Sequence, residues 1–532
     1  MKAILRTLIT LACFSLIAAD DAELHSELLG DLTFPNTGKA EAQMPFLKGV
    51  AALHSFWYDE AAELFRQAQE IDPNFVMAYW GEAMTHNHPL WRQLDRDEAL
   101  EVLNKLAPTP EARQAKTTDE KEKAWLRTAE VLYAEGDRKD RVKAWSKSLH
   151  EMSLRWPNDH EVMTNYALSV MCLADSDERD YTRNRMRCAA ICEPIYDQNP
   201  KHPGVLHYLI HAYDDPVHAP LGLPYANLYA KTAPSANHAL HMPSHIFVQL
   251  GMWDRVVDSN HDAFQSSINW VKRRKHSISK YDYHSFGWLL YGYLQQGRFQ
   301  KARDVMGEMK SLLKKEDTRT MRGAYKAMNA RYIVETGNYK HPYDLKKMED
   351  LFPSGATGSS VFAIGLAAVN NEDFETANTC LERLEKSSGE EGSSAWKRIS
   401  AQVDGIMALE LKGLIAWKKG RLTVALDHLR QAAEKELEHP APSGPVDPLK
   451  PALELYGEFL LETGDAEHAL AQFEESLLRT PRRPASLLGM ARAYKALDQK
   501  QQSLEMYREL EKVWAQADKD HPHLAEVRAA LK

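Results

Sequence analysis

The strongest constraint on the fold of this chain is a set of residue types that recurs near both ends, within a frame of about 34 residues. In residues 42–73 the set consists of Gly49, Ala61, Phe65, Ala68 and Pro73. In residues 450–481 it consists of Gly457, Ala469, Phe473, Ser476 and Pro481, with an additional Gly464. Small residues let two helices approach closely, the aromatic ring fills the remaining gap, and proline cannot continue a helix. The spacing therefore predicts tandem pairs of antiparallel helices.

The same frame fits most of residues 42–515. Pro157, Pro200 and Pro234 each close one unit of the frame, so that new units open at 160, 203 and 237. No segment combines sustained alternation of apolar and polar residues with hairpin turns, the pattern of half-buried strands. We therefore expect an all-α chain, an α-solenoid of tandem helix hairpins with roughly ten helix pairs.

Two segments interrupt the helical pattern. Residues 386–394 (KSSGEEGSS) are polar and rich in turn formers, and residues 438–449 (EHPAPSGPVDPL) contain too much proline for a helix interior. We expect an N-terminal solenoid over 42–385, a connection at 386–394 and a C-terminal solenoid over 395–530. The alternative is that both segments are long loops between helices.

Residues 1–19 have the pattern of a secretory signal peptide. Lys2 and Arg6 precede a short apolar stretch, and Asp20 follows that stretch directly. We predict cleavage after Ala19 and a periplasmic or secreted location, with an uncleaved anchor as the alternative. The four cysteines beyond this segment are too few for a disulfide framework, and pairing among Cys172, Cys188 and Cys192 is left open.

The net charge and the lengths of the apolar runs indicate which kinds of partner to expect. The net charge is −9 at pH 7, so attraction to nucleic acid or to an anionic membrane through bulk charge is not expected. No apolar run reaches the ~18 residues that a membrane span needs. We expect no nucleic-acid partner and no integral membrane span after signal cleavage.

The 34-residue frame resembles the tetratricopeptide repeat. Four segments also resemble blocks found in a group of exported bacterial tetratricopeptide proteins: AYWGEAMTHNHPLW (78–91), HYLIHAYDDPVHAPLGL (207–223), HALHMPSHIFVQLGMWD (238–254) and KPALELYGEFLLETG (450–464). The resemblance implies a right-handed solenoid whose concave groove binds a protein or peptide partner. In such repeats, positions 2, 5, 9, 12 and 13 of the first helix commonly face the ligand.

Histidines gather at these positions. Seven of the 22 histidines fall between His202 and His245, and five of the seven occupy groove positions in the frame. The resemblance implies a groove lined by His54, Trp80, His88, His207, His211, His238, His241, His245, His284 and Tyr291.

The spacing of four histidines also suits a metal ion. His207 and His211 stand four residues apart on one helical face, and His241 and His245 repeat this spacing. Neighbouring helices pack roughly 8–10 Å apart, so imidazoles from both could meet at one divalent transition metal such as zinc. Pro243 interrupts the second face.

Three acidic residues are candidates for catalysis beside such a metal: Asp214, Asp215 and Glu82. The leading functional hypothesis is nevertheless an exported scaffold that binds a peptide, protein or small ligand in a groove lined by histidine and aromatic side chains. The alternative is a metal-binding protein or metal-dependent hydrolase that uses the cluster of His207, His211, His241 and His245.

Overall fold

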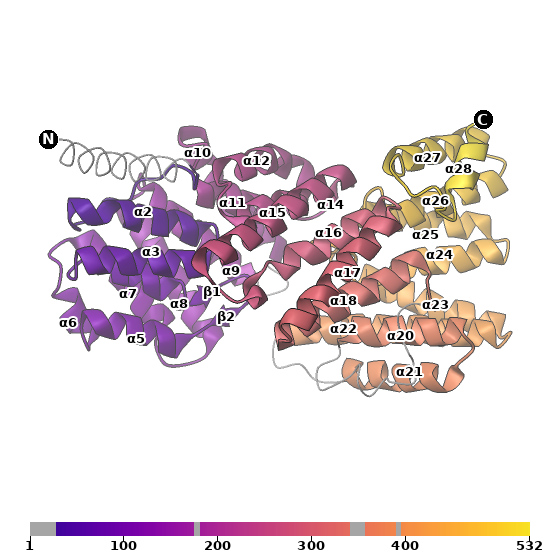
Figure 1. The fold of residues 1–532 in the computed structure, drawn as a ribbon, viewed down its shortest axis with the longest axis horizontal. Helices are drawn as coiled ribbons and strands as arrows, with labels where there is room; N and C mark the ends of the chain where they lie inside the picture. The colour runs from indigo at the N-terminus through magenta and orange to yellow at the C-terminus, as the bar shows by residue number, and fades with distance from the viewer. Residues whose placement is uncertain (1–27, 175–180, 341–356, 390–394) are drawn as a thin grey trace, which may run out of the picture. The chain divides into compact units, whose positions relative to one another are not determined.

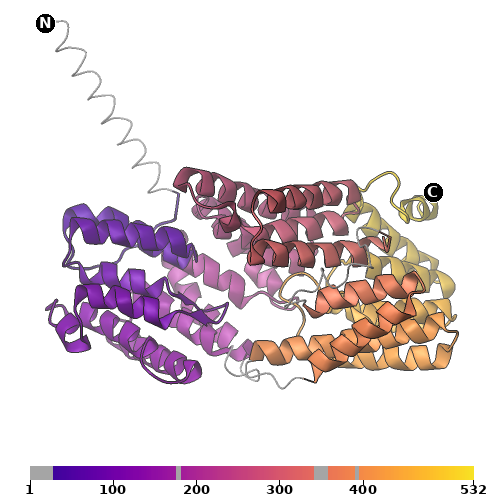
Figure 2. The same ribbon diagram turned by 60° about the horizontal axis from the view of Figure 1, so that its bottom comes forward.

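The computed structural model describes residues 28–174, 181–340, 357–389 and 395–532, which are almost entirely helical (Figure 1). The fold is all-α, built from tandem helix hairpins, as the frame predicts; two views show successive helices stacked in pairs (Figures 1 and 2). Within these residues, no helix combines the length and the apolar character that crossing a membrane requires. The predicted signal peptide at 1–19 lies outside the described residues.

The chain forms two compact units. Of the described residues, the first contains those up to Tyr213 together with Leu221–Pro243, and the second contains Asp214–Pro220 and those of Ser244–Lys532. We had expected a division at 386–394, of which 390–394 lie outside the described residues. Helices before and after that segment share one hydrophobic core, in which Phe362 and Leu384 lie with Met407 and Leu411.

The first unit consists of helix hairpins and one very short hairpin of two-residue strands, which pairs Asn87 with Leu94 and His88 with Gln93. Its elements are α2 (Ala40–His54), α3 (Tyr58–Ile71), α4 (Val76–Met84), β1 (Asn87–His88), β2 (Gln93–Leu94), α5 (Arg96–Leu106), α6 (Pro110–Gln114), α7 (Glu120–Leu132), α8 (Arg138–Arg155), α9 (His160–Ala174), α10 (Tyr181–Gln198), α11 (Pro203–Ala212), most of α12 (Ala219–Thr232), and α13 (Asn237–His241).

The second unit continues the pattern to the C-terminus. Its elements are α14 (Pro243–Gln249), α15 (Trp253–Arg274), the short 3-10 helix η2 (Ile278–Lys280), α16 (Tyr283–Gln295), α17 (Phe299–Lys315), α18 (Arg319–Thr336), α20 (Gly358–Asn370), α21 (Phe374–Ser388), α22 (Ala395–Lys418), α23 (Leu422–Leu437), α24 (Ala452–Glu462), α25 (Ala466–Arg479), α26 (Pro484–Ala496), α27 (Lys500–Val513) and α28 (Leu524–Ala530). In this unit the first helices of successive hairpins pack on one another, as α16 does on α18 and α18 on α20.

The small residues of the frame lie where the helices approach most closely. A Cβ atom added at Gly49 would lie 2.8 Å from the ring of Phe65, and one added at Gly81 would lie 2.4 Å from it. The second copy of the frame repeats this arrangement, because Gly457 and Gly489 flank Phe473 in the same way. One buried aromatic ring between two glycines therefore fixes the spacing of three consecutive helices in each copy.

The segment before α2 packs as an extended strip on the first unit. The ring of Phe34 lies 5.7 Å from that of Trp80 and 5.3 Å from that of Trp125, between centroids. Thr37 anchors the strip, because its backbone N–H and its hydroxyl both donate to the carboxylate of Glu122. Trp80, a residue we had predicted to line a groove, is consequently 1% exposed.

Candidate functional sites

Two histidines of α11 form the centre of an imidazole cluster in the first unit. Pro203 occupies the first turn of this helix, and the imidazole of His202 accepts a hydrogen bond from the backbone N–H of Val205 as its cap. His207 and His211, one turn apart, bring their Nε2 atoms to 3.1 Å from each other. Their side chains are buried, at 0% and 8% exposure. The predicted pairing of these two residues on one helical face is present.

The tautomer of His207 follows from its second ring nitrogen. Nδ1 lies 2.7 Å from the backbone carbonyl oxygen of His54. A carbonyl oxygen only accepts, so Nδ1 carries the proton and donates it. The Nε2 atom of neutral His207 therefore presents a lone pair to His211.

His238 of α13 adds a third imidazole. The nitrogen atoms that His207, His211 and His238 can offer lie within 4.8 Å of one another. Phe56 packs against all three rings, with centroid distances of 4.3, 6.2 and 5.8 Å respectively. The predicted metal set did not contain His238, which we had placed only among groove-lining residues.

The outer side of this cluster carries further aromatic side chains. Trp91, at the tip of the β1–β2 hairpin, lies 5.7 Å from the ring of His238 and is 48% exposed. His88 stacks on Tyr58 at 4.0 Å. Tyr229 stacks on the inner ring, that of His207, at 5.4 Å. The imidazoles therefore lie in a mostly apolar shell with one half-exposed edge.

A second group of histidines surrounds a buried carboxylate. Glu161 of α9 lies 2.8 Å from His54 Nε2 and 3.1 Å from His202 Nε2. Burial alone would raise the pKa of Glu161, but the two imidazoles outweigh it and lower this pKa to about 2. Sequence reasoning missed Glu161, although it occupies position 2 of the unit that opens at 160 and so carried the signal used for the histidines.

The second predicted pair, His241 and His245, is not on one helix. Helix α13 ends at His241 and α14 begins at Pro243, so the two residues stand on different helices. The two residues also belong to different compact units. His245 Nδ1 lies 2.7 Å from the carboxylate of Asp214 in the second unit.

The three predicted catalytic acids have structural partners. Asp214 accepts from Gln249 as well as facing His245. Asp215 accepts from the backbone and side chain of His218 within a turn. Glu82 is 1% exposed and accepts from Gln69 Nε2 at 2.7 Å.

The predicted groove residues differ widely in exposure. Six are buried: His54, Trp80, His207, His211, His241 and Tyr291. His88, His238 and His245 are half-buried, and His284 is exposed. Positions chosen from the frame therefore lie mainly on surfaces that other parts of the chain cover.

The second unit shows such a cover in detail. Residues 439–449, predicted to be non-helical, contain no helix or strand and contact the first helices of several hairpins. Gln249 of α14 donates to the carbonyl oxygen of Pro442 at 2.7 Å, and Arg331 of α18 donates to those of Val446 and Leu449. Between these contacts, Gly444 lies on the indole of Trp288: an added Cβ would be 2.7 Å from the ring, and the φ of this residue is +152°.

Arg479 extends the contact at the other end of this segment, where it donates to the carbonyl oxygens of His439 and Pro440. Trp288 also lies against His245 and His284, with centroid distances of 4.6 and 5.6 Å. Trp288 thus lies against two predicted groove residues, His245 and His284, and against Gly444 of this proline-rich stretch.

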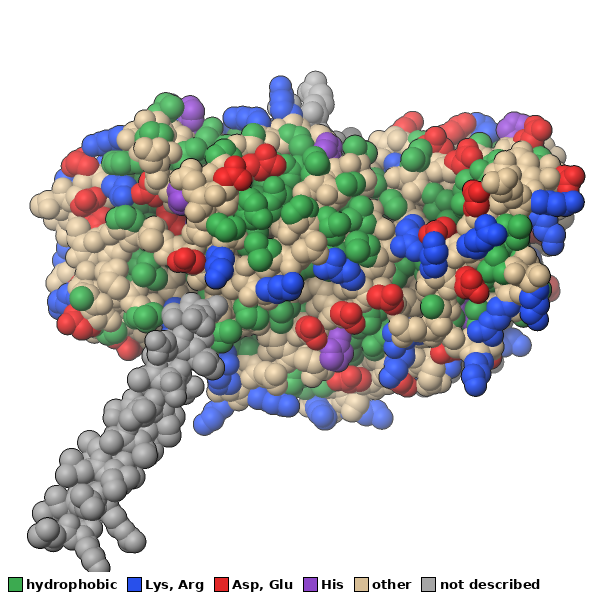
Figure 3. Space-filling view, turned by 90° about the horizontal axis from the view of Figure 1, so that it is seen from above, with side chains coloured by type: hydrophobic (Ala, Val, Ile, Leu, Met, Phe, Trp, Pro, Cys, Tyr) green, Lys and Arg blue, Asp and Glu red, His purple; other side chains and the backbone are tan. Residues whose placement is uncertain are grey.

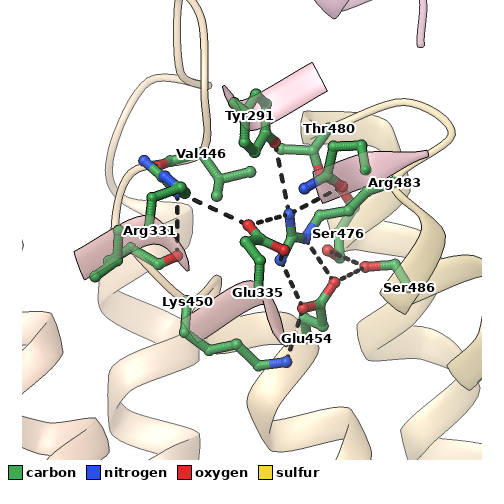
Figure 4. Close-up of polar contacts among 12 residues, drawn as sticks. Tyr291, Arg331, Glu335, Val446, Lys450, Glu454, Ser476, Thr480, Arg483 and Ser486 are labelled. Atoms are coloured by element: carbon green, nitrogen blue, oxygen red, sulfur yellow. Dashed lines mark hydrogen bonds and ion pairs between the residues drawn. The ribbon is translucent and has the colours of Figure 1, made fainter. Parts of the chain in front are cut away.

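Beneath this segment lies a buried ion-pair network (Figure 4). Arg483 forms paired hydrogen bonds with two carboxylates, those of Glu335 (2.9 and 3.1 Å) and Glu454 (2.8 and 3.1 Å). Lys450 bonds Glu454 at 2.8 Å. Burial alone would raise the pKa of Glu454, but Arg483 and Lys450 lower it to about 2. Neither the network nor the role of Arg331 was predicted, because both depend on contacts between distant repeats.

The cysteines carry no reactive signal. Cys172, Cys188, Cys192 and Cys380 are buried, and none of these four forms a disulfide. The thiol of Cys192 is hydrogen-bonded to Cys188, and this hydrogen bond together with burial raises the pKa of the Cys192 thiol. Among the described residues, the pairing left open by the sequence is thus not formed.

Charged side chains of both signs are interspersed with apolar ones on the face shown in the space-filling view (Figure 3). Exposed large apolar residues include Leu154, at 70%, in the first unit and Leu478, at 68%, in the second. Single exposed apolar side chains of this kind are common on folded proteins.

Comparison with known proteins supports the repeat. Family models described as tetratricopeptide repeat match residues 42–75 and 362–445. No curated protein matches the chain.

Similar solved structures cover nearly all of the chain at low identity. A human IFIT1 dimer with m7Gppp-AAAA has 13% identity, covers 94% of this chain and 100% of its own, and has a TM-score of 0.38. The Cut9 structure of the APC/C hetero-tetramer Cut9-Hcn1 has 12% identity, coverages of 98% and 83%, and a TM-score of 0.36. Yeast Tom70 has 13% identity, coverages of 92% and 88%, and a TM-score of 0.30. The two family-model matches, and not these structures, place tetratricopeptide repeats in each of the two units of this chain.

Proposed function

We propose that this chain is an exported tetratricopeptide scaffold, and that its second unit holds a non-helical segment of a partner protein on the face where residues 439–449 lie. The observation that supports this proposal is the chemistry of that face. Side chains of Gln249, Arg331 and Arg479 donate to main-chain carbonyls. The indole of Trp288 packs on Gly444, which has no side chain. Contacts of this kind recognise the main chain of a peptide with little demand on its sequence.

Proline favours such recognition, because a proline-rich segment is already restricted in conformation and loses little conformational entropy on binding. The resident segment includes Pro440, Pro442, Pro445 and Pro448. We therefore propose that the partner segment is proline-rich and that it competes with residues 439–449. A partner that carries aromatic or charged anchors would add contacts to Trp288 and His284.

The test uses the full chain with residues 439–445 replaced by a Gly/Ser stretch of equal length, which leaves the buried side chains of Val446 and Leu449 in place. A fluorescein-labelled peptide with the sequence of residues 438–449 is titrated against it, and anisotropy is measured. We expect saturable binding to this variant, about tenfold weaker or absent binding to the unaltered chain, and loss of affinity when Gln249→Ala is added. Absence of saturable binding to a variant with native circular dichroism would refute the proposal.

Export is a separate part of the proposal, supported by the pattern of residues 1–19. Mass spectrometry of the protein from its native host, taken from periplasmic or medium fractions, is expected to find a mature N-terminus at Asp20. A chain that keeps Met1 and stays in the cytosolic fraction would contradict it.

The alternative function, a metal-dependent hydrolase that uses His207, His211, His241 and His245, has less support. The first two imidazoles meet, whereas His245 faces Asp214 in the other unit. A hydrolase also needs a base beside its metal. The predicted bases Asp214, Asp215 and Glu82 each bond to other side chains, so the arrangement favours binding over hydrolysis.

A further inference from the structure

We propose that the first unit contains a transition-metal site formed by the imidazoles of His207, His211 and His238. The three residues come from α11 and α13, and all belong to one compact unit. Their available nitrogen atoms lie within 4.8 Å of one another. This proposal concerns the first unit and does not depend on peptide binding by the second.

The distance between His207 and His211 suits two ligands of one ion. Nitrogen ligands lie about 2.0–2.1 Å from zinc, so two of them in a tetrahedral shell are about 3.3 Å apart. The observed separation of the two Nε2 atoms is 3.1 Å. Without metal, a single N–H···N hydrogen bond from His211 to His207 satisfies the same geometry. The pair alone therefore does not distinguish a metal site from a hydrogen bond.

Two further observations favour the metal. First, the carbonyl oxygen of His54 accepts from Nδ1 of His207, and a metal-binding histidine is commonly oriented in this way by its second nitrogen. This contact leaves the lone pair of Nε2 pointing at the cluster. Second, a hydrogen-bonded pair does not require a third imidazole, yet His238 places one within reach.

The surroundings of the three rings are those of a shielded site with one access route. Phe56 packs against all three rings, and Tyr229 stacks on His207. His238 is half-buried beside the half-exposed indole of Trp91, so an ion can reach the cluster from that side. An apolar shell lowers the local dielectric and strengthens the bond between an ion and neutral nitrogen ligands.

The donor set defines the class of metal. Three imidazoles suit zinc, copper, cobalt or nickel, whereas magnesium and calcium require oxygen ligands. Three protein ligands leave a fourth position for water or a small ligand. The site differs from the set predicted from sequence, because His238 takes the place of His241 and His245.

The test measures metal binding by the untagged full chain after chelator treatment. Cobalt(II) is titrated while the visible d–d absorption is recorded, and zinc(II) is then added to displace it. We expect one equivalent of cobalt with the intense absorption of a four- or five-coordinate ion, displaced by one equivalent of zinc. His211→Ala and His238→Ala should each weaken this binding by at least about tenfold, since even the loss of a supporting contact costs that much.

Two control variants separate this site from other histidines. His468→Ala changes an exposed histidine of α25, and His245→Ala changes a member of the set predicted from the sequence. Both variants should still bind the one equivalent of cobalt that His211→Ala loses. Absence of saturable cobalt or zinc binding by the unaltered chain would overturn the proposal. Binding that survives both His211→Ala and His238→Ala, or that disappears equally in His468→Ala, would overturn it as well.

Discussion

Replacement of Arg483 by methionine should strongly destabilise the second unit. Arg483 is buried and binds the carboxylates of Glu335 and Glu454, whose side chains are 7% and 0% exposed. Methionine keeps much of the apolar volume but supplies no charge. Glu454 then retains Lys450 and the hydroxyl of Ser486, while Glu335 retains Arg331 at 4.0 Å.

The magnitude follows from the pKa of Glu454. The folded-state value is about 2 and the ordinary value is 4.5, and each unit is worth about 1.4 kcal/mol. The network therefore stabilises the charged form of this group by about 3 kcal/mol. Removal of one partner from a buried ion pair costs about 3–5 kcal/mol, because it leaves an uncompensated charge. We expect a loss of about 3–5 kcal/mol in the free energy of unfolding at pH 7.

The loss should depend on pH with a defined sign. A carboxylate whose pKa is lowered by folding contributes stability above its ordinary pKa, and this contribution disappears as the pH falls from 4.5 through 2. In Arg483→Met, protonation removes the uncompensated charges. The difference between variant and unaltered chain should therefore shrink below pH 4.5.

The assay is urea unfolding read by pulsed hydrogen exchange and mass spectrometry, because peptides from α24 and α26 report on the second unit alone. Arg430→Met is the matched control: this arginine bonds Asp427 and Glu434 on an exposed helix face, where ion pairs contribute under about 1 kcal/mol. The double variant Arg483→Met with Glu454→Gln should be more stable than Arg483→Met alone. A loss below about 1 kcal/mol at pH 7, or a loss that does not change with pH, would refute this reasoning.

Three further perturbations test other parts of the structure by the same unfolding assay. Glu161→Gln should lower the free energy of unfolding of the first unit by about 3 kcal/mol at pH 7. This loss should diminish as the pH falls from 4.5 to about 2, the lowered pKa of Glu161. A loss that does not change with pH would contradict a buried charge at this position. Neither carboxylate oxygen of Glu410 has a hydrogen-bond partner, and its pKa is raised, mainly by burial and secondly by the charge of Glu436. Glu410→Leu should therefore raise the free energy of unfolding of the second unit by about 1–3 kcal/mol at pH 8. This gain should shrink towards pH 4.5, where the carboxyl is protonated in the unfolded chain as well. Gly81→Ala should lower the free energy of unfolding by about 1–3 kcal/mol, because the added methyl group would overlap the ring of Phe65. Gly136→Ala is the control: no atom lies within 4 Å of the added methyl group, so this variant measures only the backbone strain of a positive φ.

The repeat could be read from the sequence because its determinants are local. Gly49, Ala61 and Phe65 lie within two adjacent helices, and their spacing alone specifies which residues meet. The same holds for His207 and His211, since one helical turn fixes their separation. Contacts between distant repeats have no such signature. The third imidazole, His238, and the partner of His54, Glu161, became apparent only when α11, α13 and α9 were packed together.

The second histidine pair differs from the first in its local structure. His241 and His245 have the same spacing as His207 and His211, but Pro243 starts a new helix between them. The proline was visible in the sequence, whereas the assignment of the two residues to different compact units was not.

In the family pattern the groove positions are accessible to a ligand, whereas several of them are buried in this chain. Position 5 of three repeats carries Trp80, Glu410 and Glu454, and all three side chains are at most 1% exposed. Trp80 is covered by Phe34, and Glu454 is held in the network with Arg483. Segments and side chains of the same chain already cover these positions. A partner that binds there must therefore replace intrachain contacts, and its affinity will be lower by the free energy with which residues 439–449 hold their own place.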